Sequence, residues 1–309
     1  MIVVESPGLL TTVQDLGRPM LRANGLPPGG AADTLSLRIA NLIVGNPENA
    51  AALECALVGP MLRFKRAAVV AVCGARVAGI ASNSLLRVPA GGRLSLGRIE
   101  RGVYAYVAVA GGIDVPEVLG SRATDVRLGF GGHHGRKLAK GDTLPVGVKR
   151  ATPAFGLTVS AGSVFEDVPV IRIVDGRDSA RVADDWTKRA YAVSSKSDRV
   201  GIRLDGEALA ITSEAAAQSS AVFPGTIQLP GDGRPIILAA DAQTLGGYPQ
   251  IGHVIRADLP RLVQICPGSA VRFGRVSLEE AHAALRRQEK ELALLRTGIR
   301  LRTEAHAGD

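Results

Sequence analysis

Polar side chains gather in two glycine-rich segments between residues 223 and 250. Asp241 ends the apolar run 236–240, which predicts a partly exposed carboxylate at the end of a strand. Gly246 and Gly247 follow it in a turn where a ligand can approach the backbone closely. Neutral donors and acceptors complete the set: Gln228, Gln243, Thr244 and Tyr248. One carboxylate among neutral hydrogen-bonding groups predicts a polar, glycine-lined cleft.

Charged residues also stand in glycine-rich contexts elsewhere. Segment 11–18 contains Asp15 and Arg18 and leads to the loop 25–30, although an Asx-type turn feeding a helix at Asp33 explains it equally well. Arg122 lies in segment 120–125, where the alternative is a surface pair with Asp125.

Two more segments predict anion contacts. Residues 129–136 (GFGGHHGR) suit a nest of backbone amides, with Arg136 supplying charge, but they lack the Gly-Lys-Ser/Thr of a phosphate-binding loop. The two histidines there have no acidic or cysteine partner at ligand spacing, so we predict no metal site. Asp198 and Arg199 precede an alternating run, and such a pair is usually structural.

Composition excludes several classes of function. The 309 residues carry a net charge of +8, but the basic cluster 286–302 alternates with Glu and Leu, which favours a solvated helix face over a nucleic-acid tail. Aromatic residues make up 4%, too few for base-stacking platforms. Three widely spaced cysteines indicate neither disulfides nor a zinc site. The apolar stretch 67–88 is interrupted by Arg76, so we predict a soluble, cytoplasmic protein with no membrane span.

The first half of the chain predicts two helices followed by strands. Asp33 is the expected N-cap of a helix over 33–44, and a second helix is predicted over 47–57. Short runs rich in Val, Leu and Ala then alternate with Gly and Pro, which predicts an antiparallel barrel or sandwich: 67–73, 85–88, 93–96 and 103–110.

The second half predicts more strands and one long helix. Residues 151–167 are the candidate linker. A second β segment then runs from 168–174 through 236–240 and 261–265 to residue 276. Ser277 and Glu280 form a capping box for a C-terminal helix in which three leucines recur at near-heptad spacing: Leu285, Leu292 and Leu295. This apolar stripe packs on the chain's own barrel or against a partner.

Several motifs in one order resemble a known family. They are 7–18 (PGLLTTVQDLGR), 40–46 (ANLIVGN), 111–116 (GGIDVP), 197–199 (SDR), 225–230 (GTIQLP) and 241–248 (DAQTLGGY). Between residue 3 and about residue 281 the chain resembles the biotin-dependent carboxyltransferase family. That family includes the C component of 5-oxoprolinase, also called the KipI antagonist, the proteins labelled allophanate hydrolase subunit 2, and part of urea carboxylase.

The resemblance implies a mainly β fold of two cyclophilin-like barrel halves with a few helices. The first half, 1–150, would hold the helix pair, and the second, 151–309, the C-terminal helix. It also implies a heteromeric enzyme, whose second subunit would be of the type of the B component of 5-oxoprolinase or of allophanate hydrolase subunit 1. ATP with Mg²⁺ would act at the level of that complex, which opens the ring of 5-oxoproline to give glutamate.

Residue roles follow as expectations from this resemblance. The expected catalytic residues are Asp241, Gln243, Tyr248 and Asp198. The expected substrate contacts are Gln228, Thr244, Gly246, Gly247, Asp15 and Arg18, and the expected phosphate contacts are Arg136, Arg199 and Arg122. An amide carbonyl that is phosphorylated on oxygen needs amide donors and cations around the developing charge.

Two other functions remain open. One is an allophanate hydrolase or carboxyltransferase subunit acting on urea-like substrates; because the chain lacks a Met-Lys-Met biotinyl motif, biotin would arrive on another protein. The other is a regulatory protein that binds a partner without catalysis. The family pattern has cations where this chain has Ala242 and Gln250, which leaves the anionic substrate open.

Overall fold

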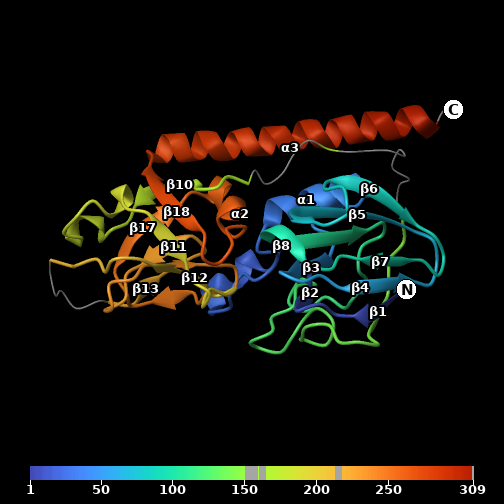
Figure 1. Ribbon diagram of the computed structural model, residues 1–309, viewed down its shortest axis with the longest axis horizontal. Coiled ribbons are helices and arrows are strands. Elements are labelled where there is room, and N and C mark those ends of the chain that lie inside the picture. The colour runs from blue at the N-terminus through green and yellow to red at the C-terminus, as the bar shows by residue number, and fades with distance from the viewer. Residues whose placement is uncertain (150–158, 160–164, 213–217, 308–309) are drawn as a thin grey trace. The chain divides into compact units, whose positions relative to one another are not determined.

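The computed structural model describes residues 1–149, 159, 165–212 and 218–307. The chain divides into two compact units (Figure 1). Unit 1 comprises residues 1–18, 29–163 and 290–309, and unit 2 comprises residues 19–28 and 164–289. Residues 19–28 and 290–309 therefore depart from a simple division at residue 150. Apart from residues 159 and 165–167, the predicted linker 151–167 lies outside the described residues.

Unit 1 contains two antiparallel sheets. The four-stranded sheet has the order β7 (Arg93–Ser95), β4 (Met61–Phe64), β1 (Ile2–Ser6) and β9 (Thr143–Leu144). The five-stranded sheet has the order β2 (Leu10–Gln14), β3 (Ala52–Ala56), β8 (Ile99–Val109), β5 (Ala68–Val77) and β6 (Ser84–Val88). One core cluster joins them, for example Val4 and Phe64 with Leu53 and Val107. Its burial supplies the main stabilising free energy of this unit.

Helix α1 (Thr34–Ile43) contacts β5 and β8 of the five-stranded sheet. Its N-cap is Asp33, whose Oδ1 accepts a hydrogen bond from the Ser36 amide at 2.9 Å, as predicted. The chain turns away at Gly45, which has a φ of 76°.

The predicted helix over 47–57 is wrong. Residues 52–56 form β3, which pairs with β2 on one side and β8 on the other and is buried along its whole length. A five-residue segment between two neighbours satisfies its backbone groups through the sheet, and this tertiary pairing overrides the helix propensity of Ala, Leu and Glu.

Unit 2 is built on a closed barrel. Its strand order is β10 (Val170–Asp175), β17 (Gln250–Val254), β14 (Thr226–Gln228), β15 (Ile236–Leu238), β12 (Gly201–Asp205), β11 (Tyr191–Val193) and β18 (Ala270–Arg275). A separate two-stranded ribbon pairs β13 (Ser220–Ala221) with β16 (Leu245–Gly246). Trp186, Tyr191 and Phe273 pack against one another in the core.

Short helices complete unit 2: η1 (Pro19–Asn24), η2 (Ser179–Arg181), η3 (Trp186–Lys188), η4 (Arg256–Asp258) and α2 (Leu259–Leu262). The predicted strand at 261–265 is therefore wrong. Pro260 lies in the first turn of α2, a position that suits proline. Leu262 and Ile265, three residues apart, both reach the core, which is helical spacing.

The C-terminal helix α3 spans Leu278–Ala307. The capping box is confirmed: Glu280 N donates to Ser277 Oγ at 3.1 Å, and Ser277 N donates to the Glu280 carboxylate at 2.7 Å. Leu292 and Ile299 are buried, whereas Leu301 is exposed. Most of the apolar stripe therefore packs on the chain itself.

Replacing Ser277 by alanine should destabilise the first turn of α3 by about 1 kcal/mol, because the Glu280 amide loses its acceptor. We expect hydrogen exchange of the Glu279 and Glu280 amides to accelerate about fivefold. The matched control is Thr297→Ala, which removes only a mid-helix bond to the Ala293 carbonyl. Equal exchange rates in the first turn of both variants would contradict the capping role.

Candidate functional site

A buried glutamine and a glycine face each other in unit 2. Gln228, at the end of β14, is 2% exposed, and its Nε2 has no hydrogen-bond partner among the residues that the structure describes. A Cβ added to Gly246 in β16 would lie 2.5 Å from this Nε2, so the close approach requires glycine. A desolvated amide without a partner costs free energy. Such a group is suited to bind a ligand oxygen.

Gln250 holds this arrangement together. Its Nε2 donates to Ser220 Oγ at 2.8 Å, and its backbone N donates to Asp178 Oδ2 at 2.8 Å. Ser220 pairs with Gly246 in the β13–β16 ribbon. The chain of contacts from β17 to β13 to β16 therefore fixes Gly246 beside Gln228. We call Gln228, Gly246, Gln250 and Ser220 the amide site.

The residues that follow Asp241 lie in the loop that carries Gly246. Gln243 is exposed, Tyr248 is 51% exposed, and Thr244 and Gly247 are half-buried. The Thr244 carbonyl accepts from Val222 N at 3.0 Å, which anchors the loop. Sequence reasoning thus named Gln228 and this loop, and the structure brings Gln228 and Gly246 together.

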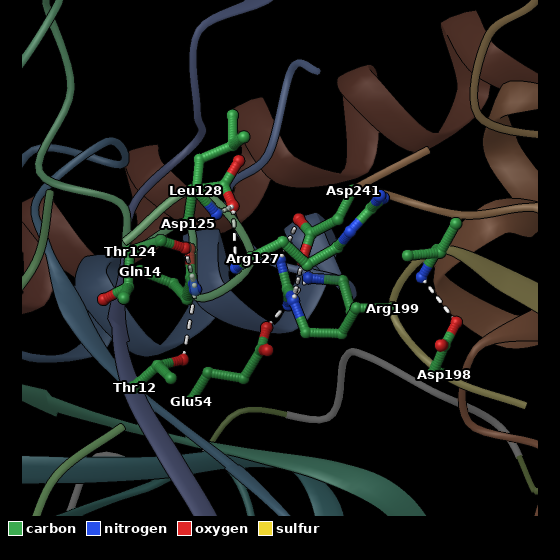
Figure 2. A network of polar contacts seen from close by, with 12 residues as sticks. Thr12, Gln14, Glu54, Thr124, Asp125, Arg127, Leu128, Asp198, Arg199 and Asp241 are labelled. Atoms are coloured by element: carbon green, nitrogen blue, oxygen red, sulfur yellow. Dashed lines mark hydrogen bonds and ion pairs between the residues drawn. The ribbon is translucent and has the colours of Figure 1, made fainter. Parts of the chain in front are cut away.

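Asp241 is not partly exposed, as the sequence predicted, but 6% exposed. Arg199 forms a two-pronged ion pair with it, Nε to Oδ2 at 2.7 Å and a second guanidinium nitrogen to Oδ1 at 2.8 Å (Figure 2). Arg199 precedes β12 and Asp241 follows β15, its neighbour in the barrel. The pair therefore links two adjacent strand ends and occupies both carboxylate oxygens.

Asp198 stabilises a turn. Its Oδ1 accepts from the amides of Val200 at 2.8 Å and Gly201 at 3.0 Å. These bonds fix the approach to β12 and thereby the position of Arg199. Its side chain is exposed.

In unit 1, Asp15 and Arg18 form hydrogen bonds with nearby groups of the protein, most of them backbone amides and carbonyls. Asp15 accepts from the Gly17 amide, the Ser121 hydroxyl and the Arg122 amide at 2.6 to 2.8 Å. Arg18, 4% exposed, donates to the carbonyls of residues 118, 121 and 123. Both side chains thus secure the loop after residue 117.

The predicted phosphate contacts Arg122 and Arg136 are ion-paired. Arg122 contacts Glu117 at 2.7 Å, not Asp125 as the alternative held. Asp125 instead accepts from the amides of Arg127 and Leu128 (Figure 2). Arg136 binds Asp142 through two bonds of 2.8 Å and holds the pKa of that carboxyl well below its ordinary range. Arg199 is paired as well, so all three arginines have carboxylate partners, and their contact with phosphate stays a prediction.

Sequence reasoning missed Gln14, which is fully buried at the end of β2. Its Nε2 donates to Thr12 Oγ1 and to the Thr124 carbonyl, each at 3.1 Å (Figure 2). A carbonyl only accepts, so the amide orientation is fixed and Oε1 is left without a partner in the described part of the chain. The one available signal was a glutamine beside apolar strand positions.

His253 in β17 was also missed. Its ring stacks on Phe223 with centroids 4.9 Å apart, and its Nδ1 has no partner among the described residues. Burial lowers the pKa of this imidazole, which favours the neutral form. The guanidinium group of Arg22 in η1 lies over the Phe223 ring, 5.8 Å from its centroid, and Arg22 also contacts the Val222 carbonyl.

Metal ligands and membrane-spanning helices are two further features that would indicate a function. Within the described ranges, no group of three or more His, Cys, Asp or Glu side chains is arranged to hold a metal ion. Likewise, no helix described here has the length and apolar character needed to cross a membrane.

Comparison with known proteins places this fold. Over residues 24–275 the chain matches the family described as the carboxyltransferase domain, subdomain A and B, and it belongs to that family, as its motifs predicted.

Its similar proteins include the C component of 5-oxoprolinase from Escherichia coli K12, 39% identical over 94% of this chain and 96% of that protein. The same component from Haemophilus influenzae is 37% identical over 90% and 92%. The crystal structure of Kluyveromyces lactis urea amidolyase superposes with a TM-score of 0.86 at 31% identity, covering 95% of this chain but 20% of that one. The mainly β class with a barrel and a C-terminal helix is thus confirmed.

Proposed function

We propose that this chain is the C component of a heteromeric, ATP-dependent 5-oxoprolinase. The observation that carries the proposal is the buried, unpartnered Gln228 amide held beside Gly246. The similarity to two bacterial proteins of that name supports it. A partner of the B component type completes the enzyme.

The lactam of 5-oxoproline is unreactive until its oxygen is activated. Phosphoryl transfer from ATP to that oxygen releases ADP and activates the lactam carbon. A first water adds to the carbon and the C–N bond breaks, which leaves an acyl phosphate and the free amine. A second water then releases phosphate and glutamate. Gln228 Nε2 donates a hydrogen bond to a substrate oxygen as negative charge builds there. This hydrogen bond is strong because the buried site excludes water. Mg²⁺ and ATP supply the phosphoryl chemistry when bound to the complex.

Other residues position the substrate. Gln243, Thr244 and Tyr248 orient it from the loop that carries Gly246. Because Asp241 is fully engaged with Arg199, we assign these two to positioning the loop and not to proton transfer. None of the three cysteines forms a disulfide in the part of the chain that the structure describes, which suits a cytoplasmic enzyme.

Co-expression with the other 5-oxoprolinase subunits tests the proposal. The purified complex should hydrolyse ATP only when 5-oxoproline is added and should release one glutamate per ATP. Light scattering should show a stable hetero-oligomer. A complex that assembles but hydrolyses no ATP with 5-oxoproline contradicts the proposal.

A carboxyltransferase acting on a urea-like substrate is the second candidate, favoured by the similarity to urea amidolyase. It requires biotin on another protein. Carboxylation of urea in the presence of a biotinylated carrier and its carboxylase would support it. Partner binding without turnover in either assay would support a regulatory protein instead.

A further inference from the structure

Unit 1 contains a cavity of about 510 Å³ that the proposed reaction does not use. It lies where several strands of that unit end: β4 at Phe64, β6 at Val88 and β8 at Val109. The start of β5 and the loop 146–149 complete its wall. The amide site, by contrast, belongs to unit 2.

Two glycines fix the loop beside this cavity. A Cβ added to Gly111 would lie 2.3 Å from the Gly147 carbonyl oxygen, and one added to Gly147 would lie 2.4 Å from the Gly111 oxygen. Gly147 N donates to the Gly112 carbonyl at 3.1 Å. This close backbone approach brings Lys149 to the end of β8.

Strand register places the other two cations. Arg87 in β6 pairs with Val69 in β5, and Arg66 lies just before β5 begins. Arg66, Arg87 and Lys149 all line the cavity, and all three are exposed residues. No Asp or Glu is among its lining residues in the part of the chain that the structure describes.

The floor of the cavity is apolar. Met1, Ala67 and Pro89 line it and are exposed, and the buried Phe64 also borders it. Ligand sites in proteins commonly have this volume and this combination of apolar walls with a few charged groups. The cations attract an anion, and contact with the apolar floor removes the apolar surface of a ligand from water.

We propose that this cavity binds an organic anion that has an apolar or aromatic body and a carboxylate, sulfonate or phosphate group. The anionic group contacts Arg66, Arg87 and Lys149, and the body lies on Met1, Ala67 and Pro89. This inference is independent of the function proposed for the amide site.

Fluorescence titration of the full chain with 8-anilinonaphthalene-1-sulfonate tests it, because that probe combines aromatic rings with one sulfonate. Arg66→Gln/Arg87→Gln should weaken binding about tenfold, and Ala67→Trp should block it because the exposed Ala67 lines the cavity. Arg76→Gln is the matched control: Arg76 is an exposed arginine of β5 that does not line the cavity. Melting temperatures should be equal for all variants.

The outcomes separate clearly. Loss of binding in the double variant and in Ala67→Trp, with retention in Arg76→Gln, supports the site. Unchanged binding in the first two, or an equal loss in Arg76→Gln, overturns it. As competitors, ATP should displace the probe and inorganic phosphate at the same concentration should not. Equal displacement by phosphate would overturn the requirement for an apolar body.

Discussion

Replacing Asp241 by alanine should lower the free energy of unfolding by about 3 kcal/mol, the scale of breaking a buried ion pair. The side chains of Arg199 and Asp241 are only 9% and 7% exposed, so solvent does not replace the lost carboxylate. Asp241→Asn should lose nearly as much, because a neutral amide does not offset the guanidinium charge. Urea denaturation followed by circular dichroism measures both variants.

The control is Asp205→Ala, which removes an exposed aspartate from β12 of the same barrel. It should change stability by less than about 0.5 kcal/mol. The double variant Arg199→Met/Asp241→Leu should recover much of the loss, because it removes both charges of this pair. A single Asp241 variant as stable as the wild type would contradict the structural role of this pair.

Gln228→Leu should separate stability from activity. The variant removes a buried amide whose Nε2 has no partner in the described structure, so stability should be unchanged or should rise by about 1 kcal/mol. Turnover of the complex should fall at least about a hundredfold, because the donor to the developing oxyanion is lost. Thermal unfolding and 5-oxoproline-dependent ATP hydrolysis measure the two effects.

Gly246→Ala tests the same site from the other side. The new methyl group meets Gln228 Nε2 at 2.5 Å and must displace it, which should also cost about a hundredfold in turnover. Gly231→Ala is the matched control, because a Cβ there has no heavy atom within 4 Å. Full activity in Gly246→Ala would show that Gln228 does not act in the reaction.

Elements with strong local signals could be predicted from the sequence. Asp33 and Ser277 cap helices through bonds that span only three residues, so the signal and the contact lie in the same short segment. The helix predicted over 47–57 failed because the partners of β3 lie about 40 residues before it and 50 residues after it in the chain.

The candidate site was predictable in composition but not in contacts. Gln228 and Gly246 were both named from the sequence, yet their approach depends on the pairing of β13 with β16 and on Gln250. Asp241 was expected to be accessible because a strand end usually is. Its burial follows from the ion pair with Arg199, which lies 42 residues away in the sequence, and no local sequence pattern predicts a contact between residues so far apart.

The interleaved composition of the two units has a consequence for biosynthesis. Residues 19–28 are made early but belong to unit 2, and residues 290–309 are made late but belong to unit 1. The buried Leu292 and Ile299 and the contact of Arg296 with Glu48 therefore form only when residues 290–299 have left the ribosome. Neither unit can be obtained whole by cutting the chain at one point, and a nascent chain that stalls near residue 289 would still lack a part of unit 1.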